Sequence, residues 1–337
     1  MPIKVALVGF GKSATVFHLP LLRVLNEYEV DSVISSRPDE VYKVLPQAKV
    51  FASLEEALAK SFADLYIITT PHHLHYVQAK QILEAGKHVV VEKPFVMRVS
   101  EGEELIKIAE EKQVVLSVYH NRRWDSGFLT LQKLMREQSL GEISFYECRY
   151  ERYRPEVQNR WRENDPLHGG LWWDLAPHLI DQALMLFGEP DNYHIDTAIQ
   201  REKSQVIDYF QIIFKYQQRR VLLKANSLAH YKAPHLLVHG TKASFLREEM
   251  DSQEEALKLG LDPSSANWGG DLQPCSYLIT HDAIETKPID AVPGTYEAFY
   301  KLIHQSITQK TEPPVTGQEA LKVIRILESL ALPHPAA

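Results

Sequence analysis

The first 120 residues alternate between short apolar runs and segments whose apolar residues recur at helical spacing. Five apolar runs predict buried β-strands, at residues 3–8, 29–34, 65–69, 88–91 and 114–119. Four segments predict helices, at residues 14–25, 55–60, 75–85 and 100–112, the last with Ser100 and Glu103 as a capping box. Buried strands that alternate with helices form parallel sheets, and right-handed crossovers place helices on both faces. The pattern therefore predicts a doubly wound α/β domain.

The rest of the 337-residue chain has a different pattern, in which strands follow one another without intervening helices. Strands are expected at residues 143–153, 206–216, 220–227, 235–240 and 243–247. Helices are expected at residues 127–137, 172–187 and 318–331, and residues 216–219 resemble a hairpin connection. We therefore expect two domains, an α/β domain at residues 1–120 and an α+β domain with an open, mostly antiparallel sheet at residues 121–337.

One expected strand of the second domain is apolar on both faces and reads Phe210-Gln211-Ile212-Ile213-Phe214. A sheet that helices cover on one side only leaves such a face exposed, and exposed apolar faces usually mark interfaces. We therefore expect a homodimer or higher homo-oligomer that forms through this sheet. The alternative is that helices of the same chain cover the second face.

The composition excludes several classes of function. Lys and Arg number 37 against 44 Asp and Glu, and the formal charge of −7 argues against nucleic-acid or anionic-membrane partners, because no basic excess neutralises phosphates. No apolar stretch approaches the ~18 residues that a membrane span requires. The two cysteines, Cys148 and Cys275, are too few for a disulfide framework or a four-sulfur zinc site. We expect free thiols in a reducing cytosol, and thus a cytoplasmic protein.

The turn after the first strand carries candidate cofactor chemistry and reads Gly9-Phe10-Gly11-Lys12-Ser13-Ala14. This is the G-x-G-x-x-G/A dinucleotide fingerprint in its required place between a strand and a helix. Gly9 permits the tight turn, Gly11 lets the backbone approach a pyrophosphate, and Ala14 permits close packing of the helix on the sheet. The alternative is an ordinary glycine turn.

The end of the second strand indicates which dinucleotide binds, and it reads Ser35-Ser36-Arg37. An NAD-binding domain usually has Asp or Glu here to bind the ribose 2′-hydroxyl. In this chain no acid occupies the tip, two hydroxyls can donate and a cation follows, which suits a 2′-phosphate. We therefore expect NADP rather than NAD, unless Arg37 is only a solvent-exposed loop residue.

Further motifs carry a family resemblance. Thr69-Thr70-Pro71 follows the third strand with His75 four residues on, and Glu92-Lys93-Pro94 follows the fourth strand. Residues 169–178 read Gly-Gly-Leu-Trp-Trp-Asp-Leu-Ala-Pro-His, and residues 315–320 read Val-Thr-Gly-Gln-Glu-Ala. Together with the glycine turn, these motifs resemble the Gfo/Idh/MocA oxidoreductase family over essentially the whole chain. They are most similar to its branch of cytosolic NADP-dependent members that act on inositols and related polyols.

The resemblance implies an N-terminal Rossmann domain and a C-terminal sheet domain that forms dimers or higher oligomers. It also implies hydride transfer between a nicotinamide and a secondary alcohol or ketone of a sugar-like ring. It assigns a catalytic role to Lys93, whose bond to Pro94 is often cis in the family. It places four further residues beside the cofactor: Thr70, Pro71, His75 and Glu92.

The residues themselves can perform this chemistry. Oxidation of a secondary alcohol requires a base for the hydroxyl proton and a hydride acceptor, which a nicotinamide supplies. Asp174 and His178 are spaced i, i+4 and share a helix face, so we expect His178 to be the general acid/base and Asp174 to position the substrate. Lys93 follows a parallel strand, and its ammonium could stabilise a developing alkoxide. The reverse assignment of His178 and Lys93 stays open.

Plainer interpretations of these residues exist. Asp174 and His178 could form a helix salt bridge, and Lys93 could be an ordinary surface lysine. The pair could also ligate zinc, but no third ligand stands out. The adjacent His72 and His73 point in different directions, so we expect no metal site.

Four more residues are candidates for substrate or nicotinamide contact. His120 and Asn121 follow the fifth strand at the sheet edge where ligands bind, and Trp161 and Arg162 precede the glycine pair at 169–170. The alternatives are residues that link the domains and a tryptophan that packs.

We therefore expect an NADP-dependent dehydrogenase or reductase of a cyclic polyol or sugar, with scyllo-inositol and its inosose as the specific pair. One alternative is a nucleotide-binding regulator of the same fold without turnover, although the presence of Lys93, Asp174 and His178 argues against it. The other is an NAD-dependent glycosidase, as some relatives are, which would recycle a tightly held cofactor.

Overall fold

The computed structural model describes residues 1–281 and 286–330, and their contacts divide the chain into two compact units. Unit 1 comprises Met1–Asn121, Gln253–Trp268 and Thr295–Glu328, and unit 2 comprises Arg122–Ser252 and Gly269–Gly294. The chain thus leaves unit 1 near the expected limit at residue 120 but returns to it twice. The expected division into 1–120 and 121–337 did not include these two returns. They depend on packing between segments that are distant in sequence, which a local pattern does not show.

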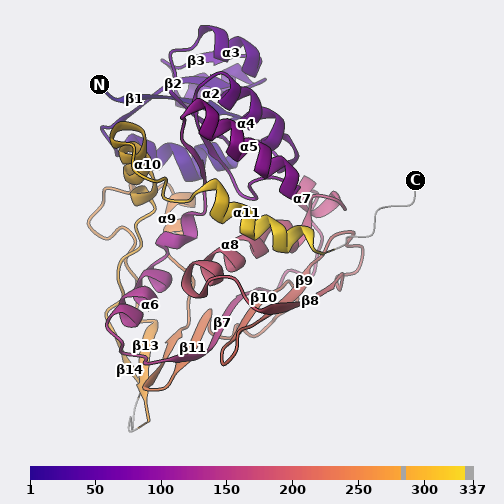
Figure 1. Cartoon of the computed structure of the whole chain (residues 1–337), viewed down its shortest axis with the longest axis vertical. Coiled ribbons are helices and arrows are strands. Elements are labelled where there is room, and N and C mark those ends of the chain that lie inside the picture. The colour runs from indigo at the N-terminus through magenta and orange to yellow at the C-terminus, as the bar shows by residue number, and fades with distance from the viewer. Residues whose placement is uncertain (282–285, 331–337) are drawn as a thin grey trace. The chain divides into compact units, whose positions relative to one another are not determined.

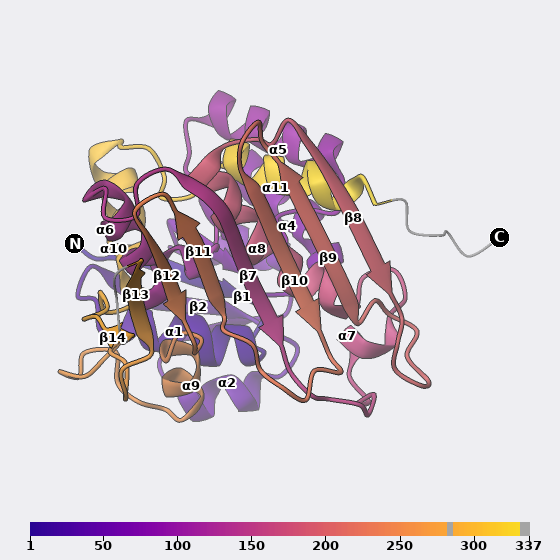
Figure 2. The same ribbon diagram turned by 90° about the horizontal axis from the view of Figure 1, so that it is seen from below.

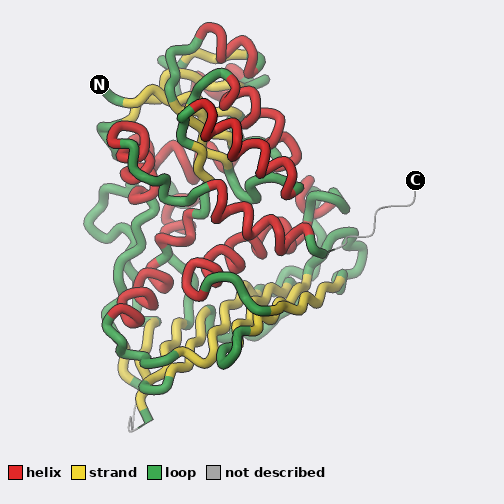
Figure 3. The backbone as a smooth tube through the Cα atoms, viewed as in Figure 1, coloured by secondary structure: helices red, strands yellow, loops and turns green. Residues whose placement is uncertain are grey.

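Unit 1 is built on a parallel six-stranded sheet in the order β3-β2-β1-β4-β5-β6 (Figures 1 and 3). Its strands are β1 Ile3–Val8, β2 Tyr28–Ile34, β3 Lys49–Phe51, β4 Leu65–Ile68, β5 His88–Val91 and β6 Leu116–Val118. The sequence pattern missed β3, whose three residues are too short a run to recognise. The order 3-2-1-4-5-6 is that of a Rossmann domain, which confirms the expected fold class.

Helices connect these strands. They are a π-helical turn at Ser13–His18 that continues as α1 Leu19–Arg23, then α2 Pro38–Val44, α3 Leu54–Lys60, α4 His75–Glu84 and α5 Val99–Lys112. The expected cap of α5 is wrong, because the helix begins one residue before Ser100. The Glu101 carboxylate, rather than that of Glu103, accepts from the backbone N–H groups of Met97 and Arg98 at 3.2 Å each. Glu101 stands at the third helical position, from which a carboxylate reaches back to the helix start.

Three helices from later in the chain complete unit 1: α9 Gln253–Lys258, α10 Glu297–Gln309 and α11 Gly317–Glu328. α11 packs along α5. Thr316 and Glu319 cap α11 reciprocally, because Thr316 Oγ1 accepts from the Glu319 N–H at 3.1 Å and the Glu319 carboxylate accepts from the Thr316 N–H at 2.9 Å. The expected end of this helix at Ala331 lies outside the described residues.

Unit 2 has an eight-stranded sheet in the order β14-β13-β12-β11-β7-β10-β9-β8, in which β7 and β10 are parallel and the other neighbours antiparallel (Figure 2). Its strands are β7 Ile143–Glu151, β8 Asn192–Ala198, β9 Tyr209–Lys215, β10 Arg220–Asn226, β11 Leu236–Gly240, β12 Ala243–Arg247, β13 Ser276–Thr280 and β14 Lys287–Pro288. The expected hairpin joins β9 to β10, where the Tyr216 N–H donates to Arg219 O at 3.1 Å. The open, mostly antiparallel sheet is therefore confirmed.

The two faces of this sheet differ in what covers them. The helices of unit 2 are α6 Ser126–Arg136, α7 Trp161–Asn164 and α8 Gly170–Phe187, and α8 packs against β9 and β10. Three side chains of β9 face α8 and are fully buried: Phe210, Ile212 and Phe214. The outer face, in front in Figure 2, holds apolar side chains that are half-buried: Ile213, Leu222, Leu237 and Leu246. The sheet is therefore apolar on both faces, as the sequence predicted.

Among residues 1–281 and 286–330, no helix combines the length and the apolar character that crossing a membrane requires.

Candidate functional site

The candidate cofactor site of unit 1 lies where the sheet order reverses, between β1 and β4. Gly9 follows β1 with φ of +93°, and a side chain here would lie 3.1 Å from Thr69 Oγ1. The Thr69 hydroxyl in turn donates to Val8 O at 3.1 Å and Gly9 O at 3.2 Å, which joins the two strand ends. Ligands of open α/β sheets bind at this reversal point, outside the carboxyl ends of the strands.

The glycine turn has room for a dinucleotide. A side chain at Gly11 would meet no heavy atom within 4 Å, so the space over this backbone is open to a phosphate. Ala14 is fully buried against the sheet, and Phe10 is buried as well, whereas Lys12 is exposed. The residues present therefore fit the pyrophosphate of a nicotinamide dinucleotide.

The tip of β2 places a cation beside the same turn. The Arg37 guanidinium donates from Nη2 to Phe10 O at 3.2 Å and pairs through Nη1 with Glu40 Oε2 at 2.8 Å. The Arg37 N–H donates to Ser35 Oγ at 3.1 Å, while Ser36 is exposed. The expected hydroxyl–hydroxyl–cation group is thus assembled at the end of β2, next to the glycine turn.

The Glu92 carboxylate connects the glycine turn to the turn that carries Lys93. Its Oε1 accepts from Ser13 Oγ and lies 3.0 Å from His18 Nε2, and its Oε2 accepts from the Lys93 N–H at 3.0 Å. His18 is fully buried, and its Nδ1 lies 2.5 Å from the Tyr300 hydroxyl of α10. One carboxylate therefore ties the cofactor motif, the Lys93 backbone and a helix from the end of unit 1 together.

The electrostatics of this cluster favour an ionised carboxylate. Burial opposes ionisation of the Glu92 carboxyl, but the hydrogen bond and charge of His18, the Ser13 hydroxyl and the Lys93 charge together lower its pKa to about 2. Because a carboxylate only accepts, His18 donates to Glu92 from Nε2, and its Nδ1 is left to bond to the Tyr300 hydroxyl.

His75 lies beneath the turns that carry Thr70 and Pro94. Its ring is buried, with Nδ1 2.9 Å from Pro94 O and Nε2 3.0 Å from Thr70 O, and burial lowers its pKa. The Thr70 hydroxyl donates to Gln78 Oε1 at 2.6 Å. The Lys93–Pro94 peptide bond is cis, as the family resemblance implied. His75 thus lies between the turns after β4 and β5, with a ring nitrogen within hydrogen-bond distance of each. Direct contacts of Thr70, Pro71 and His75 with the cofactor stay predictions.

His120 and Asn121 follow β6 at the same sheet edge of unit 1. His120 is 2% exposed and Asn121 is half-buried. Their proximity to substrate stays a prediction.

Unit 2 positions Asp174 and His178 on α8. The helix begins at Gly170, whose φ is +83° and whose Cβ would lie 2.6 Å from Ile207 O, so only glycine fits there. Asp174 lies in its second turn, is about one quarter exposed, and accepts from Arg162 Nη1 at 3.3 Å. His178 follows one turn later and is 5% exposed. The shared face that the i, i+4 spacing predicted is therefore present.

Trp161 and Arg162 lie on α7, close to this face. Trp161 is 41% exposed, and the Arg162 guanidinium lies 5.4 Å from its ring centroid. Three expected substrate residues, Trp161, Arg162 and Asp174, are thus brought together, with a cation, a carboxylate and an aromatic face available to a hydroxylated ligand.

Sequence reasoning missed His18 and Tyr300. His18 sits within the helical segment after the glycine turn, where an apolar pattern gives no reason to single it out. Tyr300 is separated from its His18 partner by 282 positions, so no local pattern could have connected them.

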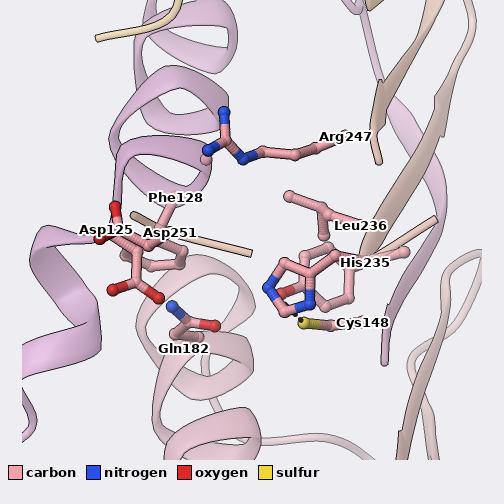
Figure 4. Close-up of a pocket in the computed structure, with 10 residues that line it drawn as sticks. Asp125, Phe128, Cys148, Gln182, His235, Leu236, Arg247 and Asp251 are labelled. Atoms are coloured by element: carbon pink, nitrogen blue, oxygen red, sulfur yellow. Dashed lines mark hydrogen bonds between the residues drawn. The ribbon is translucent and has the colours of Figure 1, made fainter. Parts of the chain in front are cut away.

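A small cavity in unit 2 is not the substrate site. It is lined by ten residues: Asp125, Gly127, Phe128, Tyr146, Cys148, Gln182, His235, Leu236, Arg247 and Asp251 (Figure 4). Its volume of about 10 Å³ holds roughly one water molecule, far less than a polyol ring needs. Burial raises the pKa of the Cys148 thiol that lines it to about 12, so this thiol stays protonated and is no nucleophile at neutral pH.

In the described ranges 1–281 and 286–330, no three His, Cys, Asp or Glu side chains are grouped so that they could hold a metal ion. Cys148 and Cys275 are both buried free thiols.

Comparisons with known proteins match both parts of the chain. The family model described as "Oxidoreductase family, NAD-binding Rossmann fold" matches residues 3–120, and the model described as "Oxidoreductase family, C-terminal alpha/beta domain" matches residues 132–332. The chain is 42% identical over 331 residues to the scyllo-inositol 2-dehydrogenase (NADP(+)) IolW of Bacillus subtilis, over 97% of this chain and 92% of that protein. It is 39% identical to the uncharacterized oxidoreductase YdgJ of Escherichia coli, over 97% of this chain and 94% of that protein.

Solved structures agree with these matches. The structure of yvaA from Bacillus subtilis has a TM-score of 0.93 and 42% identity, and the match covers 97% of this chain and 94% of that one. A structure from Yersinia pestis has a TM-score of 0.92 and 38% identity, over 100% of this chain and 98% of that one.

Proposed function

The chain belongs to the Gfo/Idh/MocA family of oxidoreductases, and we propose that it transfers a hydride between NADP and a secondary alcohol or ketone of a cyclic polyol or sugar. Scyllo-inositol and its inosose are the proposed substrate pair. The proposal rests on the second strand of the Rossmann sheet, which ends in two serines and an arginine. The chain that carries this strand is 42% identical to a protein named as an NADP-dependent scyllo-inositol 2-dehydrogenase.

The choice of NADP rests on the tip of β2. Arg37 already lies within hydrogen-bond distance of the glycine turn, and its ion pair with Glu40 is half exposed. An exposed ion pair of this kind is weak and can yield to a phosphate, which accepts two hydrogen bonds from a guanidinium. Ser35 and Ser36 add hydroxyl donors beside it.

The proposed chemistry assigns a separate role to each candidate residue. When bound, the nicotinamide accepts the hydride from the carbinol carbon. His178 removes the hydroxyl proton of the same carbon and returns a proton to the ketone oxygen in the reverse direction. The Lys93 ammonium stabilises negative charge on that oxygen, and Asp174 accepts hydrogen bonds from neighbouring ring hydroxyls. Lys93 and His178 could exchange their roles in proton transfer, and the pH profiles of their variants separate the two assignments.

The experiment is NADP⁺ reduction across a panel of inositols, aldoses and cyclic diols, with NAD⁺ in parallel. We expect turnover of an inositol with NADP⁺ and little with NAD⁺. His178→Asn should lower turnover about 100-fold while leaving NADPH binding unchanged. Equal turnover in this variant would contradict the role of His178.

The two alternatives have distinct results in the same experiment. Tight NADPH binding without turnover of any panel member would favour a nucleotide-binding regulator. Release of a chromophore from a coloured glycoside, with cofactor that stays bound, would favour an NAD-dependent glycosidase.

We further propose that the protein forms a homodimer or higher homo-oligomer through the outer face of the unit 2 sheet. Ile213 and Leu222 are cross-strand neighbours on this face, as are Leu237 and Leu246, and all four are half-buried within the single chain. A second copy would bury them further. A cytoplasmic location stays a prediction.

A further inference from the structure

The segment that joins β7 to α8 carries Trp161 and Arg162, yet little apolar burial holds it in place. Between residues 152 and 168 most side chains are exposed, including those of Tyr153, Arg154 and Leu167. The segment pairs with the rest of unit 2 through an isolated bridge between Tyr153 and Leu228. Polar contacts must therefore fix the part that bears the two candidate substrate residues.

A buried guanidinium supplies those contacts. Arg201, in the loop between β8 and β9, is 8% exposed. Its Nη1 donates to Glu163 Oε2 at 3.0 Å and reaches Arg154 O at 3.5 Å and Glu156 O at 3.4 Å. The same Glu163 oxygen accepts from the Gln158 N–H at 3.0 Å. Arg201 thus meets the segment at its beginning and at α7.

Arg201 is itself anchored to the sheet. Its Nε donates to Asp208 Oδ2 at 3.0 Å, and that oxygen also accepts from the Arg201 N–H at 3.0 Å. Asp208 is 1% exposed, its Oδ1 accepts from the Gln200 N–H at 2.7 Å, and its carbonyl accepts from the Ser227 N–H at 3.1 Å. Asp208 stands directly before β9, so the anchor does not depend on the exposed segment.

The geometry requires arginine rather than any cation. Nε and Nη1 diverge from one rigid plane and bind two carboxylates on different segments at once. A lysine ammonium is a single point and cannot span both positions in the same way. Glu163 follows Arg162 directly in α7, and the Arg162 guanidinium pairs with Asp174 at 3.3 Å. The bond from Arg201 to Glu163 therefore acts one residue away from this pair.

We propose that Arg201 is a positioning residue, which holds Arg162 and Trp161 beside Asp174 through its bond to Glu163 and so sets how tightly a hydroxylated ring binds. The inference rests on the proposed function. Arg201 lies outside the expected site residues. In this proposal it controls the affinity for the polyol and leaves cofactor binding in unit 1 unchanged.

The test compares Arg201→Lys and Glu163→Gln with Arg136→Lys, a matched control on an exposed position of α6. For Arg201→Lys we expect the KM for scyllo-inositol to rise about tenfold with a smaller change in kcat and an unchanged Kd for NADPH. Glu163→Gln should change the KM in the same direction by less, because its amide oxygen can still accept one hydrogen bond. Arg136→Lys should match the unsubstituted protein.

Limited trypsin digestion tests the same inference without turnover. Loss of the anchor should speed cleavage after Arg160 and Arg162 about tenfold, relative to sites elsewhere in the chain. Cleavage that speeds up equally at all sites, or a KM and cleavage pattern unchanged in both variants, would overturn the proposal. Absence of polyol turnover in the unsubstituted protein would refute the proposed function, whereas selective cleavage at these two sites would still support the anchor.

Discussion

Replacement of Glu92 by glutamine removes the charge at the centre of the buried cluster in unit 1. The carboxylate is 14% exposed and receives hydrogen bonds from His18, Ser13 and the Lys93 N–H. Glutamine loses the negative charge and keeps only one accepting oxygen. Its amide NH₂ group would then face one of the groups that donate to the carboxylate, so that two donors would point at each other. Both effects destabilise the folded state, because a buried donor loses its partner.

The magnitude follows from the pKa of the Glu92 carboxyl, which falls from 4.5 to about 2 because His18 and Ser13 more than offset the opposing effect of burial. A shift of this size corresponds to about 3 kcal/mol of stability at neutral pH. Because the folded pKa lies below the unfolded one, this contribution is complete above about pH 4.5 and is lost as the pH falls toward 2. Between neutral pH and about pH 3.5 it should shrink by about 1.4 kcal/mol.

Urea unfolding followed by circular dichroism measures this difference. Glu92→Gln should unfold at lower urea than the unsubstituted protein at neutral pH, and the gap should narrow in acid. Glu104→Gln is the control, because the ion pair of Glu104 with Lys80 is exposed and should contribute little. Equal stability of Glu92→Gln at neutral pH, or a gap that does not change with pH, would refute the assignment of a stabilising buried carboxylate.

Three further predictions concern other parts of the molecule. Arg37→Gln should raise the KM for NADP⁺ about 10- to 100-fold and leave use of NAD⁺ unchanged, because it removes charge-assisted bonds to a 2′-phosphate; an equal effect on both cofactors in steady-state kinetics would contradict this. Leu222→Arg should convert an oligomer to monomers in size-exclusion chromatography with light scattering, because it places a charge on the outer sheet face; an unchanged mass would exclude that face. Burial, with the charges of Arg122 and Arg247, lowers the pKa of His235 to about 4. As the pH is lowered, this histidine therefore binds a proton in the unfolded chain before it does so in the folded one, and the free energy of unfolding should fall as the pH goes from 6.5 to 4. His235→Gln should flatten that part of the curve of urea midpoint against pH, and an unaltered slope would show that other groups cause it.

The sequence was enough to predict the parallel sheet and the sheet edge that carries the candidate cofactor motifs. Fully buried strands give continuous apolar runs, and the carboxyl ends of parallel strands meet at one edge. The turns at Gly9, Thr70 and Glu92 therefore had to lie at the same edge of the sheet. On α8, the i, i+4 spacing was enough to place Asp174 and His178 on one face.

Long-range partners were beyond the sequence. Glu92 is held by His18, and His18 in turn bonds to Tyr300, which reaches it only because α10 returns to unit 1. Arg201 looked like an ordinary loop residue, because its burial depends on where the exposed segment folds back. The predicted cap of α5 was wrong for a local reason. Glu101 and Glu103 both lie in the first turns of the helix, and it is the Glu101 carboxylate that reaches the backbone N–H groups at the helix start.

Hydride transfer can be followed directly with scyllo-inositol deuterated at every ring carbon. The protein is incubated with this substrate and NADP⁺, and the NADPH formed is examined by mass spectrometry and NMR. We expect one deuterium at C4 of the reduced nicotinamide and an inosose as the oxidised product. Absence of NADPH, or NADPH without deuterium, would contradict the proposal that this chain oxidises a polyol by hydride transfer to NADP⁺.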